Sequence, residues 1–132
     1  MTRAIDIMTE LPVTISPEAT VEAAVRTLEA LEIRHLPVVD EEGELVGMLS
    51  DRDLRGAMGA SDGGGVPLAA HIADVMNTNV VQALPDDELA DLAQLMVDQR
   101  IGALPIVDER GLLVGIVSYV DLLRSMIERP SA

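Results

Sequence analysis

The sequence predicts an α+β fold in which two similar β-α-β-β-α units form one compact module. The first observation is an internal repeat: residues 5–54 match residues 73–122 at a constant offset of 68, with 17 identities in 50 positions and no gap. The second is that each half shows the same order of β-rich runs and helical apolar spacing. Two copies are too few for a solenoid, so we expect two halves, 1–66 and 67–132, related by a pseudo-two-fold axis.

Each element follows from a local signal. Thr20 is a suitable N-cap for an amphipathic run, and a Gly-bearing loop at 40–43 between two β-rich runs predicts a hairpin. In the first half we expect a strand at 13–15, a helix from Thr20 to about 32, strands at 36–39 and 45–49, and a helix from Ser50. In the second half we expect a strand at 80–83, a helix at 88–99, strands at 104–107 and 113–117, and a helix at 118–128. The Gly-rich stretch 59–65 is expected to link the halves.

Composition and charge exclude several classes of function. With no Phe or Trp and a single Tyr, the chain offers no aromatic platform for nucleic-acid bases. The net charge of −14, with Arg as its only cation besides His, argues against binding to nucleic acids or anionic membranes. The absence of Cys excludes disulfides and thiolate sites. No apolar run approaches the ~20 residues that span a bilayer, so we expect a cytoplasmic protein.

A Ser-x-x-Asp motif opens the last helix of each half. GMLSDRD at 47–53 matches GIVSYVD at 115–121, and only the spacing of Ser50 with Asp53, and of Ser118 with Asp121, persists between the copies. The pattern is typical of a capping box. It also suits a ligand, because a carboxylate can accept hydrogen bonds from both ribose hydroxyls while the helix start binds phosphate. Both interpretations remain open.

The unit order, its duplication, the LPVVDE-x-G-x-L-x-G hairpin and the G-x-x-S-x-x-D segment resemble the CBS domain over about residues 5–126. Two copies in a short chain resemble a stand-alone CBS pair. The resemblance implies sheet-to-sheet packing, clefts that bind adenosine compounds (AMP, ADP, ATP or S-adenosylmethionine), and dimerisation through the terminal helices. It further implies regulation of an unidentified partner protein. It gives Ser50, Asp53, Ser118 and Asp121 the role of ribose and phosphate ligands.

The two halves differ in their cations. Arg34 and His35 correspond to Gly102 and Ala103, and Arg52 corresponds to Val120. The resemblance places basic residues near phosphates, but Arg52 also suits a surface ion pair and His35 a half-buried position. The candidate ligand-binding residues are Thr14, Ile15, Arg34, His35, Ser50, Arg52 and Asp53, with Gln82, Ala83, Ala103, Ser118 and Asp121 in the second half. We expect no resident metal and no required cofactor, although Mg²⁺ can accompany a nucleotide.

Two other classes of function were compared with this one. A ligand-independent interaction module would use apolar faces of the terminal helices, namely Leu54, Ala57 and Met58, and Leu122, Leu123, Met126 and Ile127. An enzyme is not expected, because the chain has no nucleophile elbow, no phosphate loop and no pair of His ligands. The hairpin carboxylates, including Asp40 and Asp108, are interpreted as turn residues rather than catalysts.

Overall fold

The computed structural model describes residues 1–58 and 67–128, apart from the side chains of 55–58. These residues form two compact units. The first-repeat unit is Val13–Val80, and the second-repeat unit joins Met1–Pro12 to Val81–Ala132. The α+β class and the two repeats are confirmed. The predicted linker lies outside the described residues, and the boundary between 66 and 67 stays a prediction.

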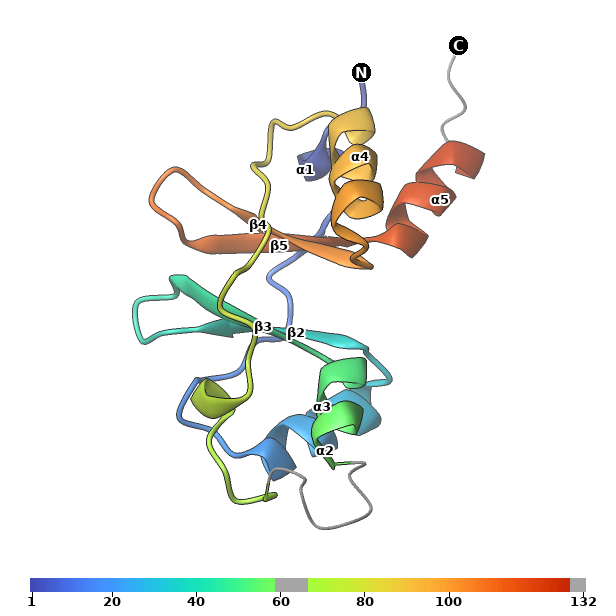
Figure 1. Ribbon diagram of the computed structural model, residues 1–132. Coiled ribbons are helices and arrows are strands. Elements are labelled where there is room, and N and C mark those ends of the chain that lie inside the picture. The colour runs from blue at the N-terminus through green and yellow to red at the C-terminus, as the bar shows by residue number, and fades with distance from the viewer. Residues whose placement is uncertain (59–66, 129–132) are drawn as a thin grey trace. The chain divides into compact units, whose positions relative to one another are not determined.

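The first-repeat unit is a two-stranded hairpin with its helices on one side (Figure 1). Its elements are α2 (Val21–Leu31), β2 (His35–Val39), β3 (Leu45–Ser50), α3 (Asp51–Met58) and the 3-10 helix η1 (Ile72–Asp74). The buried core consists of Val21, Ala24, Leu28, Leu36, Val38, Leu49, Leu54 and Ile72. Burying aliphatic side chains from both layers is the main favourable term that holds helices to a sheet face.

The local signals in this unit act as predicted. Thr20 caps α2 by accepting a hydrogen bond from the Ala23 N–H at 3.1 Å. In the hairpin loop, Gly43 takes φ +86°, a region that favours glycine. Asp40 Oδ1 accepts from the backbone N–H groups of Glu42 at 3.0 Å and Glu44 at 2.9 Å. This hairpin carboxylate is therefore a turn-forming group, and Asp108 repeats the arrangement in the second hairpin.

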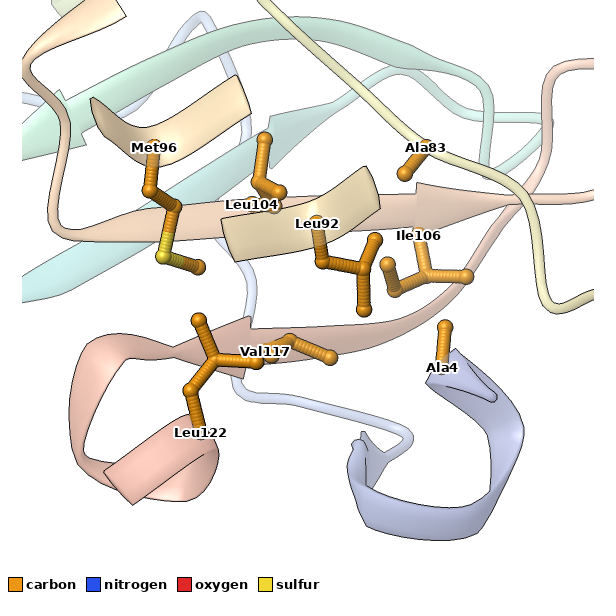
Figure 2. Packing of buried hydrophobic residues seen from close by; sticks show 8 residues of the cluster. All are labelled: Ala4, Ala83, Leu92, Met96, Leu104, Ile106, Val117 and Leu122. Carbon is orange, nitrogen blue, oxygen red and sulfur yellow. The ribbon is translucent and has the colours of Figure 1, made fainter. Parts of the chain in front are cut away.

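The second-repeat unit contains an antiparallel sheet in the order β1-β5-β4. Its elements are α1 (Ala4–Ile7), β1 (Thr9–Glu10), α4 (Leu89–Gln99), β4 (Ala103–Val107), β5 (Leu113–Ser118) and α5 (Tyr119–Glu128). Figure 2 shows the core between these helices and the sheet. It consists of Ala4, Ala83, Leu92, Met96, Leu104, Ile106, Val117 and Leu122.

The predicted strands at 13–15 and 80–83 are shorter in the structure. Each is reduced to one parallel bridge, Ile15 with Val38 and Ala83 with Ile106. Ile15 donates to the Pro37 carbonyl at 3.1 Å and accepts from Val39 at 3.1 Å. In each run only one residue forms a bridge to the adjacent strand, whereas a strand needs consecutive bridged residues. The prediction of full strands there was wrong.

Two short elements were not anticipated: α1 and β1. Elements of two to four residues lack the periodicity that a sequence pattern needs. Long-range bonds hold α1, since Ala4 N–H donates to the Asp87 carbonyl at 2.8 Å and Ile5 N–H to the Pro85 carbonyl at 3.0 Å. In the described part of the chain, no helix is long and apolar enough to cross a bilayer.

Two residues expected on exposed helix faces lie in the core instead. Leu54 is 2% exposed and Leu122 is 8% exposed, because each faces the hairpin of its own unit. Leu123, Met126 and Ile127 are exposed as expected. The side chains of Ala57 and Met58 lie outside the described residues.

Candidate functional site

The start of α3 is built by the end of the first hairpin. Strand register places His35 opposite Ser50. Arg34, one residue earlier, accepts a hydrogen bond from the Asp51 N–H at 2.8 Å through its carbonyl. Ser50 Oγ accepts from the Asp53 N–H at 2.9 Å, which satisfies one of the free donors of the helix start. The predicted residues Arg34, His35, Ser50 and Asp53 therefore meet at one end of this hairpin.

The charged side chains at this helix start are open to solvent. Asp53 is exposed, and among the described residues its carboxylate receives no hydrogen bond and forms no ion pair. Arg34 and Arg52 are also exposed. Within residues 1–58 and 67–128, neither of them forms an ion pair. One free carboxylate and two free guanidinium groups thus border Ser50.

His35 is the half-buried member of the group, in agreement with the structural interpretation of this residue. Burial lowers the pKa of His35 below its ordinary value of 6.5; nearby Asp53 and Asp51 raise it, and Arg34 lowers it. The neutral imidazole is consequently favoured at pH 7. Because Asp53 and Arg34 both act on this pKa, the three side chains are within electrostatic reach of one another.

The start of α5 repeats the backbone geometry. Ala103 lies opposite Ser118, and Tyr119 N–H donates to the Gly102 carbonyl at 3.0 Å. Ser118 Oγ accepts from the Asp121 N–H at 3.2 Å, and Asp121 Oδ2 accepts from the Ser118 N–H at 2.8 Å. This reciprocal pair is a complete capping box. Capping by the Ser hydroxyl is therefore confirmed at both helix starts, whereas of these two starts, as far as the structure describes them, the complete capping box forms only at Ser118 and Asp121.

The Asp121 carboxylate is enclosed, unlike that of Asp53. Its side chain is 18% exposed, and its second oxygen lies 4.0 Å from Arg124 Nη1. Sequence reasoning missed Arg124 as part of this site. The signal available was its spacing, since an acid and an Arg three residues apart lie on one helix face.

The remaining candidates differ in the surface they present. Thr14 and Gln82 are exposed, and Ile15 is partly buried. Ala83 and Ala103 are buried at 3% and 6% exposure, so their methyl groups belong to the core. Among residues 1–58 and 67–128, no three His, Asp or Glu side chains are grouped so that they would hold a metal ion.

The fold and the helix-start geometry together define a module made of two similar α+β units, each with a Ser-x-x-Asp helix start. The family model of the CBS domain matches residues 4–60 and again residues 72–128. The chain belongs to the CBS domain family.

Relatives of similar size support this membership. The CBS domain-containing protein YhcV of Bacillus subtilis is 38% identical over 129 residues, covering 96% of this chain and 87% of YhcV. A crystal structure of the CBS domain pair of protein MJ0100, in complex with 5'-methylthioadenosine and S-adenosyl-L-methionine, is 29% identical with a TM-score of 0.87, covering 98% of each chain. A crystal structure of CBSX2 in complex with AMP is 25% identical with a TM-score of 0.85, covering 97% of this chain and 98% of the other.

Other relatives are much longer. The chain spans 23% of the length of an inosine-5'-monophosphate dehydrogenase from Methanocaldococcus jannaschii and 24% of a homoserine O-acetyltransferase from Methanococcoides burtonii. The similarity to these two proteins thus covers a minor part of each.

Proposed function

We propose that this chain is a regulatory module that binds an adenosine compound at the Ser-x-x-Asp helix starts and signals its presence to a partner protein. AMP, ADP, ATP and S-adenosylmethionine are the candidate ligands. The proposal assigns no catalytic step to the chain.

The observation that carries the proposal is the free Asp53 carboxylate beside the Ser50 hydroxyl. A carboxylate can accept hydrogen bonds from both hydroxyls of a ribose, and such charge-assisted bonds are stronger than neutral ones. Ser50 Oγ lies at the helix start, where backbone N–H groups favour an anionic group. Arg34 and Arg52, exposed nearby, supply cations in a chain whose net charge of −14 would otherwise repel phosphate.

The comparisons support the same class of ligand. The structures of the MJ0100 pair and of CBSX2 contain adenosine compounds, and both align over almost the whole of this chain. Mg²⁺ would enter, under the proposal, only as the counterion of a nucleotide.

Isothermal titration with AMP, ADP, ATP and S-adenosylmethionine tests the proposal. We expect a dissociation constant near micromolar for at least one ligand, about −8 kcal/mol. Asp53→Ala should weaken binding at least about tenfold, because the ribose loses a charged acceptor. Glu41→Gln is the matched control, since it removes one exposed negative charge from the hairpin loop of the same unit. Affinity weaker than about millimolar for all four compounds would refute ligand binding.

A second candidate function is self-association through α5, which a specific surface favours. Met126 is 64% exposed and Ile127 is 80% exposed, and Leu123 lies beside them on the same helix. Large apolar side chains grouped on one helix are typical of an interaction surface. We propose a homodimer that uses this helix, and ligand binding and dimerisation are compatible.

A further inference from the structure

We infer that the two helix starts are not equivalent binding sites: the first takes the adenosine ligand, and the second is held closed by the bonds that already occupy Asp121. This inference rests on the proposed function and adds which of its two sites is used. It concerns only residues within each unit.

The first step is the count of free acceptors at each carboxylate. A ribose presents two neighbouring hydroxyls, and a carboxylate accepts from both most readily when neither of its oxygens is already engaged. At Asp53 both oxygens are free among the described residues. At Asp121, Oδ2 already accepts from the Ser118 N–H at 2.8 Å, and Oδ1 faces Arg124 at 4.0 Å.

The second step is the cost of opening the second site. A ribose at Asp121 must either share Oδ2 with the Ser118 N–H or displace that charge-assisted hydrogen bond and leave the N–H without its acceptor. Displacing such a bond lowers affinity by about tenfold or more. The ion pair with Arg124 adds less, because it is long and the Arg124 side chain is largely exposed.

The third step is the chemistry around each carboxylate. Arg34, His35 and Arg52 offer donors near Asp53. The corresponding residues of the second repeat are Gly102, Ala103 and Val120, none of which has a polar side chain. Among the described residues, the first helix start therefore offers an anionic ligand two unpaired Arg side chains. The described part of the second offers only Arg124, which already forms an ion pair with Asp121.

Within this scheme Arg124 is a positioning residue. Its Nη1 lies 4.0 Å from Asp121 Oδ1, and this attraction would favour the conformation in which Oδ2 accepts from the Ser118 N–H. Its removal should loosen the second site and leave the first unchanged. A purely structural role would alter stability and not the relative affinity of the two sites.

Tyr119 can serve as an NMR probe of the second site. Tyr119 is the only Tyr in a sequence without Trp or Phe, and it directly follows Ser118. Its ring gives a single set of aromatic NMR signals, apart from those of the two His residues. A shift of these signals reports on the start of α5.

The test combines titration calorimetry and Tyr119 ring NMR with AMP as the probe, on the full chain. We expect about one AMP per chain, at least about tenfold weaker binding for Asp53→Asn, and less than about a twofold change for Asp121→Asn. Asn keeps a side-chain carbonyl that can still accept from the Ser118 N–H, so this variant should fold. The Tyr119 signals should shift only at AMP concentrations about tenfold higher than those that saturate the heat of binding measured by calorimetry.

Arg124→Gln supplies the second variant, with uncharged adenosine as the probe so that the lost cation does not change phosphate attraction. The Tyr119 signals should then shift at about twofold to fivefold lower adenosine than in the wild type. Arg110→Gln is the control, because Arg110 lies near Asp108 in the hairpin of the same unit and not near Asp121.

The outcomes separate this inference from the function it rests on. Two AMP molecules bound with equal affinity, or loss of binding in Asp121→Asn with binding kept in Asp53→Asn, would overturn the inference and leave the proposed function standing. The inference would also be overturned, with the proposed function intact, if the Tyr119 signals shifted over the same AMP concentrations as the heat of binding and still shifted in Asp53→Asn. No binding of any adenosine compound would overturn both.

Discussion

Met8 lies over Gly115 in the second-repeat unit, where a Cβ added to the glycine would come within 2.9 Å of Met8 Cγ and 3.1 Å of the Thr9 carbonyl oxygen. The first-repeat unit contains the same relationship between Met76 and Gly47, with 2.9 Å to Met76 Cγ and 3.3 Å to the Asn77 carbonyl oxygen. The docked segment precedes the hairpin in the second-repeat unit and follows it in the first-repeat unit, and in both units the glycine leaves room for it.

Gly115→Ala should therefore destabilise the second-repeat unit by about 1–3 kcal/mol, because the added methyl group overpacks the contact with Met8. Urea unfolding followed by circular dichroism measures the change. Gly115→Ala combined with Met8→Ala should recover part of the loss, since the second substitution removes the clashing sulfur and methyl. Strict additivity of the two substitutions would show that they do not interact.

Ser125→Ala should raise the free energy of unfolding by about 1 kcal/mol. Ser125 is 4% exposed, and its hydroxyl has no hydrogen-bond partner in the described structure. A buried unsatisfied hydroxyl costs free energy that an alanine avoids. The first repeat already carries Ala57 at the matching position. Ser16→Ala is the control: this hydroxyl accepts from the Glu18 N–H at 3.1 Å, so its loss should give no stabilisation.

Asp40→Ala should destabilise the first hairpin by about 1–2 kcal/mol, because two backbone N–H groups lose their shared acceptor. Asp108→Ala should have a similar effect in the second hairpin. Glu41→Ala, at the exposed loop tip beside Asp40, is the control. Equal denaturation midpoints for Asp40→Ala and Glu41→Ala would contradict the role of the Asp40 carboxylate.

Stability should fall as the pH drops below about 6.5, in part through His35. Burial lowers the pKa of His35 in the folded state below its ordinary value of 6.5. Between the two values the unfolded chain binds more protons than the folded chain, so the free energy of unfolding rises with pH in that window.

Thermal or urea unfolding of the wild type and of His35→Asn, at about pH 7.5 and about pH 5.5, measures this contribution. The variant should lose less stability between the two conditions than the wild type does. His71→Asn is the control for the other, exposed histidine. An identical pH dependence for the wild type and His35→Asn would show that His35 does not contribute.

Met126→Glu and Ile127→Glu should dissociate the proposed homodimer, because each places a charge on the exposed apolar face of α5. Light scattering after size exclusion measures the mass in solution. Val97→Glu on α4 is the control, since Val97 is equally open to solvent but lies on another helix. A wild-type chain that is monomeric at all concentrations would refute dimerisation.

Much of the fold was predictable because it follows from local signals that occur twice. Thr20 caps α2, Gly43 turns the first hairpin, and Ser118 begins α5 as the residue types and their spacing indicate. The second copy strengthened each of these predictions, because a signal that recurs at an offset of 68 is unlikely to be accidental. The four Ser and Asp residues of the candidate site were identified in the same way, from a Ser-x-x-Asp spacing that recurs in both repeats.

The sequence by itself determined the two repeats, their helices and hairpins, and the positions of Ser50, Asp53, Ser118 and Asp121. Tertiary structure alone decided that residues 1–12 fold with residues 81–132, and that Asp121 is occupied while Asp53 is free. The physical reason is the range of the interactions. Caps and turns act over three or four residues, whereas the docking of Met8 on Gly115 joins residues far apart in the chain. Which oxygen a carboxylate keeps free depends on the side-chain conformation adopted once the helix is packed.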